Sequence, residues 1–280
     1  MIMNSRILGL ATFAALTVAC SSNPAPAPTP SRNTPARPPG DGPARILLAT
    51  GYTGTAILER NDSIILALPN GGRQVQRLSR RARFAVNVND RGEVRVRLDS
   101  LVFRPSAANS EREAVGATWT GRLTPEGLDN VRSDRRSTVV AELTQAVHDL
   151  FPALPRSGVA TGDRWADTSQ GRRQVEIFEA NDERFANWTV GRRSTRSGIL
   201  VLPVTATESY TQLGQGEQAG REMRMSSEGR RTRTYYIAMS GRTDAIVQVD
   251  SASRLITIPS TRQAVPTTQV VRTRVGWDYR

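Results

Sequence analysis

The sequence predicts a mainly β protein of the β-rich α+β type: one large, curled antiparallel sheet of about a dozen strands, half-barrel like, with one or two helices packed on its concave face. Three observations support this prediction. Apolar and polar residues alternate with period 2 through most of the chain after residue 44, glycine-containing turns separate the alternating runs, and one segment has helical periodicity. A sheet this wide twists strongly and curls on itself, which leaves a concave side for a helix to fill.

The start of the chain has the pattern of an export signal. Residues 7–19 carry no charge, follow a short segment that contains Arg6, and are too few to span a bilayer as a helix. Cys20, the only cysteine of the chain, comes directly after them. We therefore expect a signal peptide over residues 1–19.

The residues before this cysteine resemble the lipobox of bacterial lipoproteins: Leu16, Thr17, Val18 and Ala19. The resemblance implies that lipid is attached to the Cys20 sulfur, that the chain is cleaved before it, and that the new amino group is acylated. Because Ser21 rather than an aspartate follows, the resemblance favours anchoring in the outer membrane, facing the periplasm or the cell surface. The alternative is an ordinary secretory signal with an incidental cysteine.

Residues 20–43 contain the acylated cysteine and a predicted linker. Residues 21–43 hold 8 of the 16 prolines and no aromatic or large aliphatic side chain, so they cannot bury a core. The remainder, residues 44–280, is long enough to form a single β-rich domain. With Cys20 acylated, that domain would contain no disulfide.

Residues 44–131 predict about five or six antiparallel strands. Apolar and polar residues alternate over residues 84–88 and 94–98, and Asn89 to Gly92 between them can form a hairpin turn. Two further turns are predicted at residues 69–72 and 124–127 because both segments combine proline and glycine.

Residues 135–151 interrupt this pattern and predict an amphipathic helix. Its apolar residues recur at helical spacing: Val139, Val140, Leu143, Ala146, Val147 and Leu150. We expect Ser133 or Asp134 to cap its start and Pro152 to end it. Such a helix needs a sheet against which to bury its apolar face.

After the helix, alternation resumes in shorter runs. These predict strands at residues 174–178, 188–190, 199–207, 222–225, 232–238, 245–249, 255–258 and 267–277. Gly241 lies where a hairpin would turn, and Pro203 is expected to place its strand at an edge or a bulge.

Two resemblances refine the predicted fold. The order of meander, helix and second meander resembles the incomplete β-barrel of the lipoprotein localisation factors, the Lol-type carrier and receptor. A second resemblance, to uncharacterised bacterial envelope lipoproteins, rests on Phe151 to Pro155, Val159, Gly162, Asp163 and Trp165, with closing segments at residues 232–236 and 265–269. Those families have no assigned activity, and we interpret the LP to GDxW segment as structural.

The formal charge is +12, and all 38 basic residues are arginines. Along the alternating runs, arginines recur at positions that could form an anion-binding face: Arg81, Arg83, Arg95, Arg97, Arg231, Arg233, Arg272 and Arg274. Guanidinium groups bind phosphate and carboxylate at any pH of the cell envelope. The alternative is a solvated outer face with interleaved acids, and codon bias explains the choice of arginine over lysine.

The sequence gives little support to catalysis. His148 is the only histidine and is expected at a solvated position, so a Ser-His-Asp triad or a metal site with several histidines has no support, and no cofactor is expected. A carboxylate-based hydrolase is the remaining enzyme alternative, because four carboxylates cluster around one hairpin: Glu176, Glu179, Asp182 and Glu183.

Two functional hypotheses follow. The first is a lipid-anchored, non-catalytic protein of the bacterial envelope that binds an apolar or lipid ligand in a groove of the curled sheet, lined by aliphatic residues and by Trp119 or Trp188. The second is an envelope scaffold whose arginine-rich face contacts anionic lipid, cell-wall polymer or a protein partner. Export argues against nucleic acid as a partner.

Overall fold

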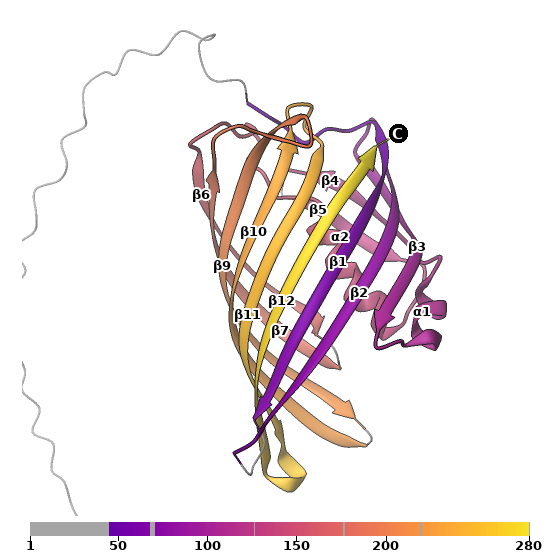
Figure 1. Ribbon diagram of the computed structural model, residues 1–280, viewed down its shortest axis with the longest axis vertical. Helices are drawn as coiled ribbons and strands as arrows, with labels where there is room; N and C mark the ends of the chain where they lie inside the picture. The colour runs from indigo at the N-terminus through magenta and orange to yellow at the C-terminus, as the bar shows by residue number, and fades with distance from the viewer. Residues whose placement is uncertain (1–44, 68–70, 126, 176, 219, 280) are drawn as a thin grey trace, which may run out of the picture. The chain divides into compact units, whose positions relative to one another are not determined.

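Figure 1 shows the computed structural model, which describes residues 45–67, 71–125, 127–175, 177–218 and 220–279. The lipobox, Cys20 and the predicted linker lie outside the described residues. Over the described part of the chain there are twelve strands, two α-helices and one 3₁₀ helix. No helix in this part has both the length and the apolar character that crossing a membrane requires.

Five strands and both α-helices come first along the chain. They are β1 (Tyr52–Ala67), β2 (Arg73–Val88), β3 (Glu93–Arg104), α1 (Ala108–Ala114), β4 (Thr118–Thr124), β5 (Gly127–Ser133) and α2 (Thr138–Asp149). The later elements are β6 (Arg164–Val175), β7 (Phe178–Val190), β8 (Ser194–Arg196), β9 (Ile199–Gln218), β10 (Arg221–Ala238), β11 (Thr243–Ile258), η1 (Pro259–Thr261) and β12 (Gln263–Tyr279).

All of these strands belong to one antiparallel sheet. Its order is β5-β4-β3-β2-β1-β12-β11-β10-β9-β7-β6, and the short β8 pairs with β9. The first and last strands of the chain therefore pair with each other inside the sheet, while β5 and β6 end the two sides of this path. The sheet stays open and coils along its long strands into a half-barrel around α2 (Figure 1). The predicted fold class is confirmed.

The upper concave face of the sheet is apolar. Consecutive cross-strand partners on this face form one row of buried aliphatic and aromatic side chains: Val190, Val204, Tyr235, Ile246, Val275, Leu58 and Ala82. Helix α2 packs on this row through Val140, Leu143 and Val147, which are buried in the same core. The helix thus buries the stripe that its sequence predicts.

The start of α2 differs from the prediction. Ser137, rather than Ser133 or Asp134, caps the helix, because its Oγ accepts a hydrogen bond from the backbone N–H of Val140 at 3.2 Å. Asp134 instead accepts a hydrogen bond from the backbone N–H of Thr118 at 2.9 Å, which connects the segment before the helix to the start of β4. The helix itself spans fewer residues than the expected 135–151.

The strands of the second half are longer than their apolar runs. Residues 222–225 and 232–238, predicted as separate strands, belong to the single strand β10. Residues 245–249 and 255–258 are likewise both part of β11. The sequence pattern breaks between each pair because the concave positions there carry polar and charged side chains.

Pro203 lies in β9, which is an internal strand between β10 and β7, so the expected edge or bulge position is wrong. The Pro203 carbonyl accepts from the N–H of Gly191 at 2.8 Å, beyond the last β7 pair at Val190 and Val204. Proline has no N–H to donate, and Pro203 would donate toward β7. Because the pairing of β7 with β9 ends at Val190 and Val204, no ladder hydrogen bond is lost there.

The LP to GDxW segment joins α2 to the sheet. Val159 forms a two-residue bridge with Ile46 through hydrogen bonds of 2.8 and 2.9 Å. Asp163 accepts from the backbone N–H of Ala160 at 2.9 Å and from Arg45 at 2.7 Å. Trp165 stacks on Trp188 with ring centroids 5.4 Å apart. These contacts support the structural interpretation of the segment.

Candidate ligand-binding cavity

Below the apolar row, the concave face of the sheet carries a dense set of charges, which we call the charged belt. It consists of twelve side chains on α2 and six strands: Arg60, Asp62, Arg80, Glu142, Asp149, Asp182, Arg184, Glu208, Arg231, Arg233, Asp250 and Arg254. The ten belt residues on strands share the concave face because, in each strand, they lie an even number of positions from a buried residue of the apolar row.

Arg231 and Asp250 form the centre of the belt. They are neighbours across β10 and β11, and the guanidinium donates from Nε to Asp250 Oδ2 at 2.9 Å. Tyr210 donates its hydroxyl to the other carboxylate oxygen at 2.7 Å. Glu208 lies 3.5 Å from Arg231 on the β9 side. Although burial disfavours the charged guanidinium and Arg233 repels it, the nearby carboxylates raise the pKa of Arg231 above its ordinary value.

Gly229 makes room for this arrangement. It faces Tyr210 across the β9–β10 pair, and a Cβ at this position would lie 2.5 Å from the Tyr210 hydroxyl oxygen. Only a residue without a side chain lets the phenol ring lie flat over β10 and reach Asp250.

Arg233 connects the sheet to α2. Its guanidinium donates to Gln248 Oε1 at 2.7 Å and to the Tyr235 hydroxyl at 2.9 Å, and lies 2.9 Å from Asp149 of the helix. Burial would raise the pKa of the Asp149 carboxyl, but Arg233 and two further arginines hold that pKa below its ordinary value. Burial raises the pKa of Tyr235 to about 12. The helix is thereby held to the belt by an ionised carboxylate.

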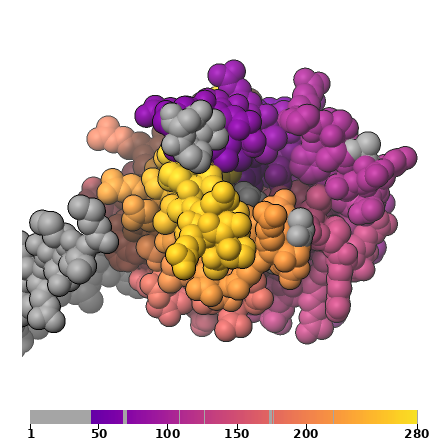
Figure 2. Space-filling model, turned by 90° about the horizontal axis from the view of Figure 1, so that it is seen from below, coloured from indigo at the N-terminus to yellow at the C-terminus, as the bar shows by residue number. Residues whose placement is uncertain are grey.

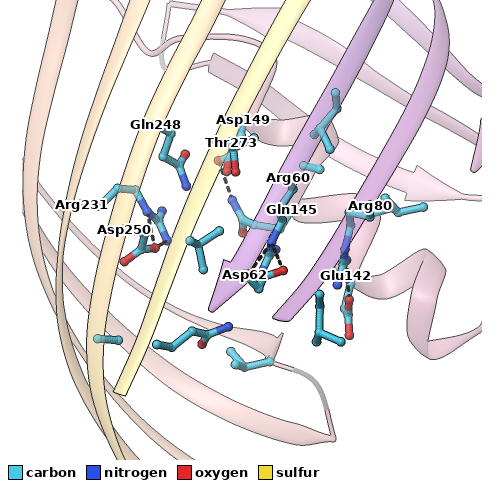
Figure 3. Close-up of a pocket in the computed structure, with 18 of the residues that line it drawn as sticks. Arg60, Asp62, Arg80, Glu142, Gln145, Asp149, Arg231, Gln248, Asp250 and Thr273 are labelled. Atoms are coloured by element: carbon cyan, nitrogen blue, oxygen red, sulfur yellow. Dashed lines mark hydrogen bonds and ion pairs between the residues drawn. The ribbon is translucent and has the colours of Figure 1, made fainter. Parts of the chain in front are cut away.

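Two more ion pairs lie on the side of the belt formed by β1 and β2. Arg60 forms an ion pair with the buried Asp62 of the same strand, and its Nη2 donates to Asp62 Oδ1 at 2.9 Å. Arg80 pairs with Glu142 of α2 at 2.8 Å and lies over the ring of Phe103. Figure 3 shows these pairs facing one cavity together with Arg231 and Asp250.

The cavity lies between α2 and the concave strands and has a volume of about 430 Å³. Strands β1, β2, β11 and β12 line most of it, β9, β10 and β6 contribute fewer residues, and α2 contributes Glu142, Leu143, Gln145, Ala146 and Asp149. The lining mixes belt residues with aliphatic ones such as Leu58, Ile64 and Val271. In Figure 2, seen from below, a hollow lies between the indigo β1–β2 hairpin, the yellow β11–β12 hairpin and the orange β9–β10 hairpin.

A second apolar cluster lies beyond the belt, toward the end of the strands away from the main core. Phe178, Ala180 and Met225 are its buried members. Val175 packs against this cluster and also lines the cavity. The concave face therefore passes from apolar to charged and back to apolar along the strands.

The predicted anion-binding face does not form as a unit. Six of its arginines are exposed on the convex side of β2, β3 and β12: Arg81, Arg83, Arg95, Arg97, Arg272 and Arg274. We call these the convex arginines. Arg231 and Arg233 are buried, 6% and 5% exposed, on the opposite side of the sheet. Arg231 and Arg233 recur at every second position, as the convex arginines do, but the register of β10 turns them inward.

The other singled-out residues are also placed differently from the expectation. Trp119 is buried in the core and donates to Thr144 at 2.8 Å, while Trp188 is stacked between Trp165 and Tyr235, so neither lines the cavity. His148 is half-buried and not solvated, with Nδ1 3.0 Å from the Leu128 carbonyl oxygen.

The three described carboxylates among those considered for hydrolysis do not converge. Glu179 and Glu183 are exposed, whereas Asp182 is buried in the belt and accepts from Arg184 at 2.6 Å. Glu176 lies outside the described residues. In the described part of the chain no group of three or more His, Cys, Asp and Glu residues could hold a metal ion.

No known protein-family model matches the sequence, and no curated protein matches it. Among the solved structures that match, two illustrate the degree of similarity. OccK2 (OpdF) from Pseudomonas aeruginosa has 9% sequence identity and a TM-score of 0.26, with 81% of this chain and 99% of that chain covered. A LolA-superfamily protein from Nitrosomonas europaea has 8% identity and a TM-score of 0.19, with 84% and 89% covered. TM-scores this low carry no argument about the fold. The resemblances to the lipoprotein localisation factors and to uncharacterised envelope lipoproteins therefore stay predictions.

We predict that the two faces of the sheet respond differently to loss of a carboxylate. Asp250→Asn should lower the free energy of unfolding by roughly 3 kcal/mol, because it leaves the buried Arg231 without its nearest countercharge. Glu59→Gln is the matched control: Glu59 faces Arg81 and Arg274 on the convex side but is 55% exposed, so the loss should stay below about 1 kcal/mol. Urea unfolding of both variants measures the difference, and equal losses would contradict a buried, interdependent belt.

Proposed function

We propose that this protein is a lipid-anchored, non-catalytic protein of the bacterial cell envelope that binds an amphipathic ligand in the concave cavity. The observation that supports this most is the cavity itself, about 430 Å³ in volume and lined by both aliphatic and hydrogen-bonding side chains. Cavities of roughly 300 to 1,000 Å³ hold typical small ligands. The lining offers a ligand apolar contact and polar recognition at the same time.

The charged belt narrows the class of ligand. A purely hydrocarbon ligand would cover Arg231, Asp250 and Gln248 without replacing the hydrogen bonds that water gives them, which is unfavourable. A ligand with a polar part can satisfy those groups while its apolar part contacts residues such as Ile64 and Val271. We therefore extend the expectation of an apolar or lipid ligand to an amphipathic one.

The state of the carboxylates supports binding over catalysis. Glycoside hydrolysis needs a carboxylic acid whose pKa is raised so that it can donate a proton. In the cavity, Asp62, Glu142 and Asp250 each contact a guanidinium, and the pKa of Asp149 is lowered. Carboxylates that are paired with guanidinium groups act as hydrogen-bond acceptors for a ligand and as supports for the arginines.

Blocking the cavity should abolish binding. Thr273 is half-buried and lines the cavity, so Thr273→Trp should fill it and weaken binding of the neutral amphiphile laurdan by at least about tenfold, measured by its fluorescence. Thr232→Trp, which makes the same change at an exposed convex position, should leave the affinity unchanged.

Native mass spectrometry of the protein purified from cells gives an independent readout. The mass spectrum should show a lipid bound to the unsubstituted protein and no lipid bound to the Thr273→Trp variant. No binding of laurdan by the original chain, or equal binding by both variants, would overturn the proposal.

The anchor depends on Cys20. Full-length protein produced in a bacterial host with an alkyne-labelled fatty acid should incorporate the label, because acylation of this thiol follows from the resemblance of residues 16–20 to a lipobox. Cys20→Ser should remove the label and leave the chain at its uncleaved mass. Labelling that persists in this variant would contradict attachment at Cys20.

The convex arginines support a second candidate function, an envelope scaffold that contacts anionic surfaces. They lie on β3, β2 and β12, and β1 between the last two contributes Glu59, placed between Arg81 and Arg274. A positive surface of this kind attracts anionic lipid or polymer at low salt.

Vesicle binding distinguishes the second candidate. A protein that lacks residues 1–20 should bind vesicles rich in phosphatidylglycerol at low ionic strength, release them as salt rises, and lose affinity when Arg81, Arg83, Arg272 and Arg274 are changed to glutamine. Binding that is absent or insensitive to salt would eliminate this function.

A further inference from the structure

The charges that line the cavity are balanced. Four arginines and four carboxylates contribute to its wall: Arg60, Arg80, Arg231, Arg254, Asp62, Glu142, Asp149 and Asp250. The chain as a whole has a formal charge of +12, so this neutrality is local to the concave side. A cavity meant for an anion in such a basic protein would have been expected to keep the excess of arginine.

The opposite charges of the cavity wall also lie next to one another in pairs. Arg60 lies 2.9 Å from Asp62, Arg80 lies 2.8 Å from Glu142, and Arg231 lies 2.8 Å from Asp250. Asp149 faces Arg233, which lies next to it in the belt, at 2.9 Å. Each of these carboxylates therefore has its countercharge in the protein already.

The remaining polar wall is uncharged and rich in amides. It consists of Gln76, Gln145, Gln212, Gln248 and Gln269 together with Tyr210 and Thr273. Amide side chains offer both donors and acceptors to a ligand and carry no net charge. Hydroxyl, amide, phosphodiester or ammonium groups of a ligand can all be matched by such a wall, provided that their charges cancel.

The apolar part of the wall gives the ligand a direction. Helix α2 with its belt residues Glu142 and Asp149 lies at one end of the cavity, and Val175 connects the other end to the cluster of Phe178 and Met225. A polar head would therefore lie against the belt beneath α2, and an apolar chain would extend toward the distal cluster.

We infer that the ligand is an amphiphile whose head group has no net charge, either neutral or zwitterionic, and that the cavity discriminates against amphiphiles with a charged head. This inference rests on the proposed function and names its ligand class. A cationic head transferred into this wall loses its hydration and meets carboxylates that arginines already pair, and an anionic head meets arginines whose charge the four carboxylates balance. A neutral or zwitterionic head exchanges hydrogen bonds with water for hydrogen bonds with the belt.

A series of amphiphiles with the same dodecyl chain tests the inference. Dodecyl maltoside is neutral, dodecylphosphocholine is zwitterionic, dodecanoate is anionic and dodecyltrimethylammonium is cationic. We expect the purified protein to bind at least one of the first two at least about tenfold more tightly than either ionic amphiphile, measured by laurdan displacement below each micellar concentration at pH 8. The far-UV circular dichroism spectrum is recorded in parallel to exclude unfolding.

Changing the charge of the wall should change the preference. Gln76 lines the cavity but is exposed, so it can be replaced without disturbing the core. Gln76→Arg should improve the affinity for dodecanoate by several-fold, and Gln76→Glu should do the same for dodecyltrimethylammonium. Neither change should improve the affinity for dodecyl maltoside.

The outcomes separate this inference from the proposed function. Tight binding of dodecanoate or dodecyltrimethylammonium that Thr273→Trp abolishes would overturn the inference on the head group and leave an amphiphile-binding cavity in place. Binding of none of the four amphiphiles would overturn both. Equal affinities for all four would show that the chain alone is recognised and would also overturn the inference.

Discussion

The packing of α2 into the concave side of the sheet is the contact on which the rest of the structure depends. A single open sheet has one face that must be covered, and Val140, Leu143 and Val147 of the helix cover its apolar upper row. The opposite side of the same helix carries Glu142 and Asp149, which pair with arginines of the sheet. The helix therefore seals the core with one side and forms the roof of the cavity with the other. Without it the sheet would expose both an apolar row and buried charges to water.

The charged belt gives this fold its specificity rather than its stability. Burying charges is costly, and well-made ion pairs roughly offset that cost. A shift of one residue in the pairing of β10 would, however, turn Arg231 and Arg233 outward and bring Thr232 and Thr234 inward, leaving Asp250 and Asp149 without countercharges. The belt thus penalises a one-residue shift in the pairing of long strands whose apolar pattern is interrupted. The same fixed network gives a ligand a preorganised polar wall.

Local sequence patterns predict much of the fold because they report local chemistry. Gly92 and Gly241 occupy their hairpin turns with positive φ, and the amphipathic stripe of α2 identifies the helix and its buried face. The sequence pattern does not predict the full lengths of β10 and β11. Residues such as Ser227, Arg231 and Asp250 interrupt the apolar alternation that identifies a strand, although they lie in the middle of continuous ladders. Hydrogen bonds to neighbouring strands, which no local pattern records, keep these segments extended.

The sequence by itself determines which residues share a face of a strand, because side chains alternate with period 2. It therefore groups Arg81 with Arg83 and Arg231 with Arg233 without saying which side of the sheet each pair occupies. Only the tertiary structure decides that the first pair is convex and the second concave, because packing in the core turns Phe84 of β2 and Tyr235 of β10 inward. Arg81 and Arg83 lie on the face opposite to Phe84, whereas Arg231 and Arg233 share the face of Tyr235. The cavity is likewise a tertiary feature. Its arginines and carboxylates come from strands and a helix far apart in sequence, and only the curl of the sheet brings them together.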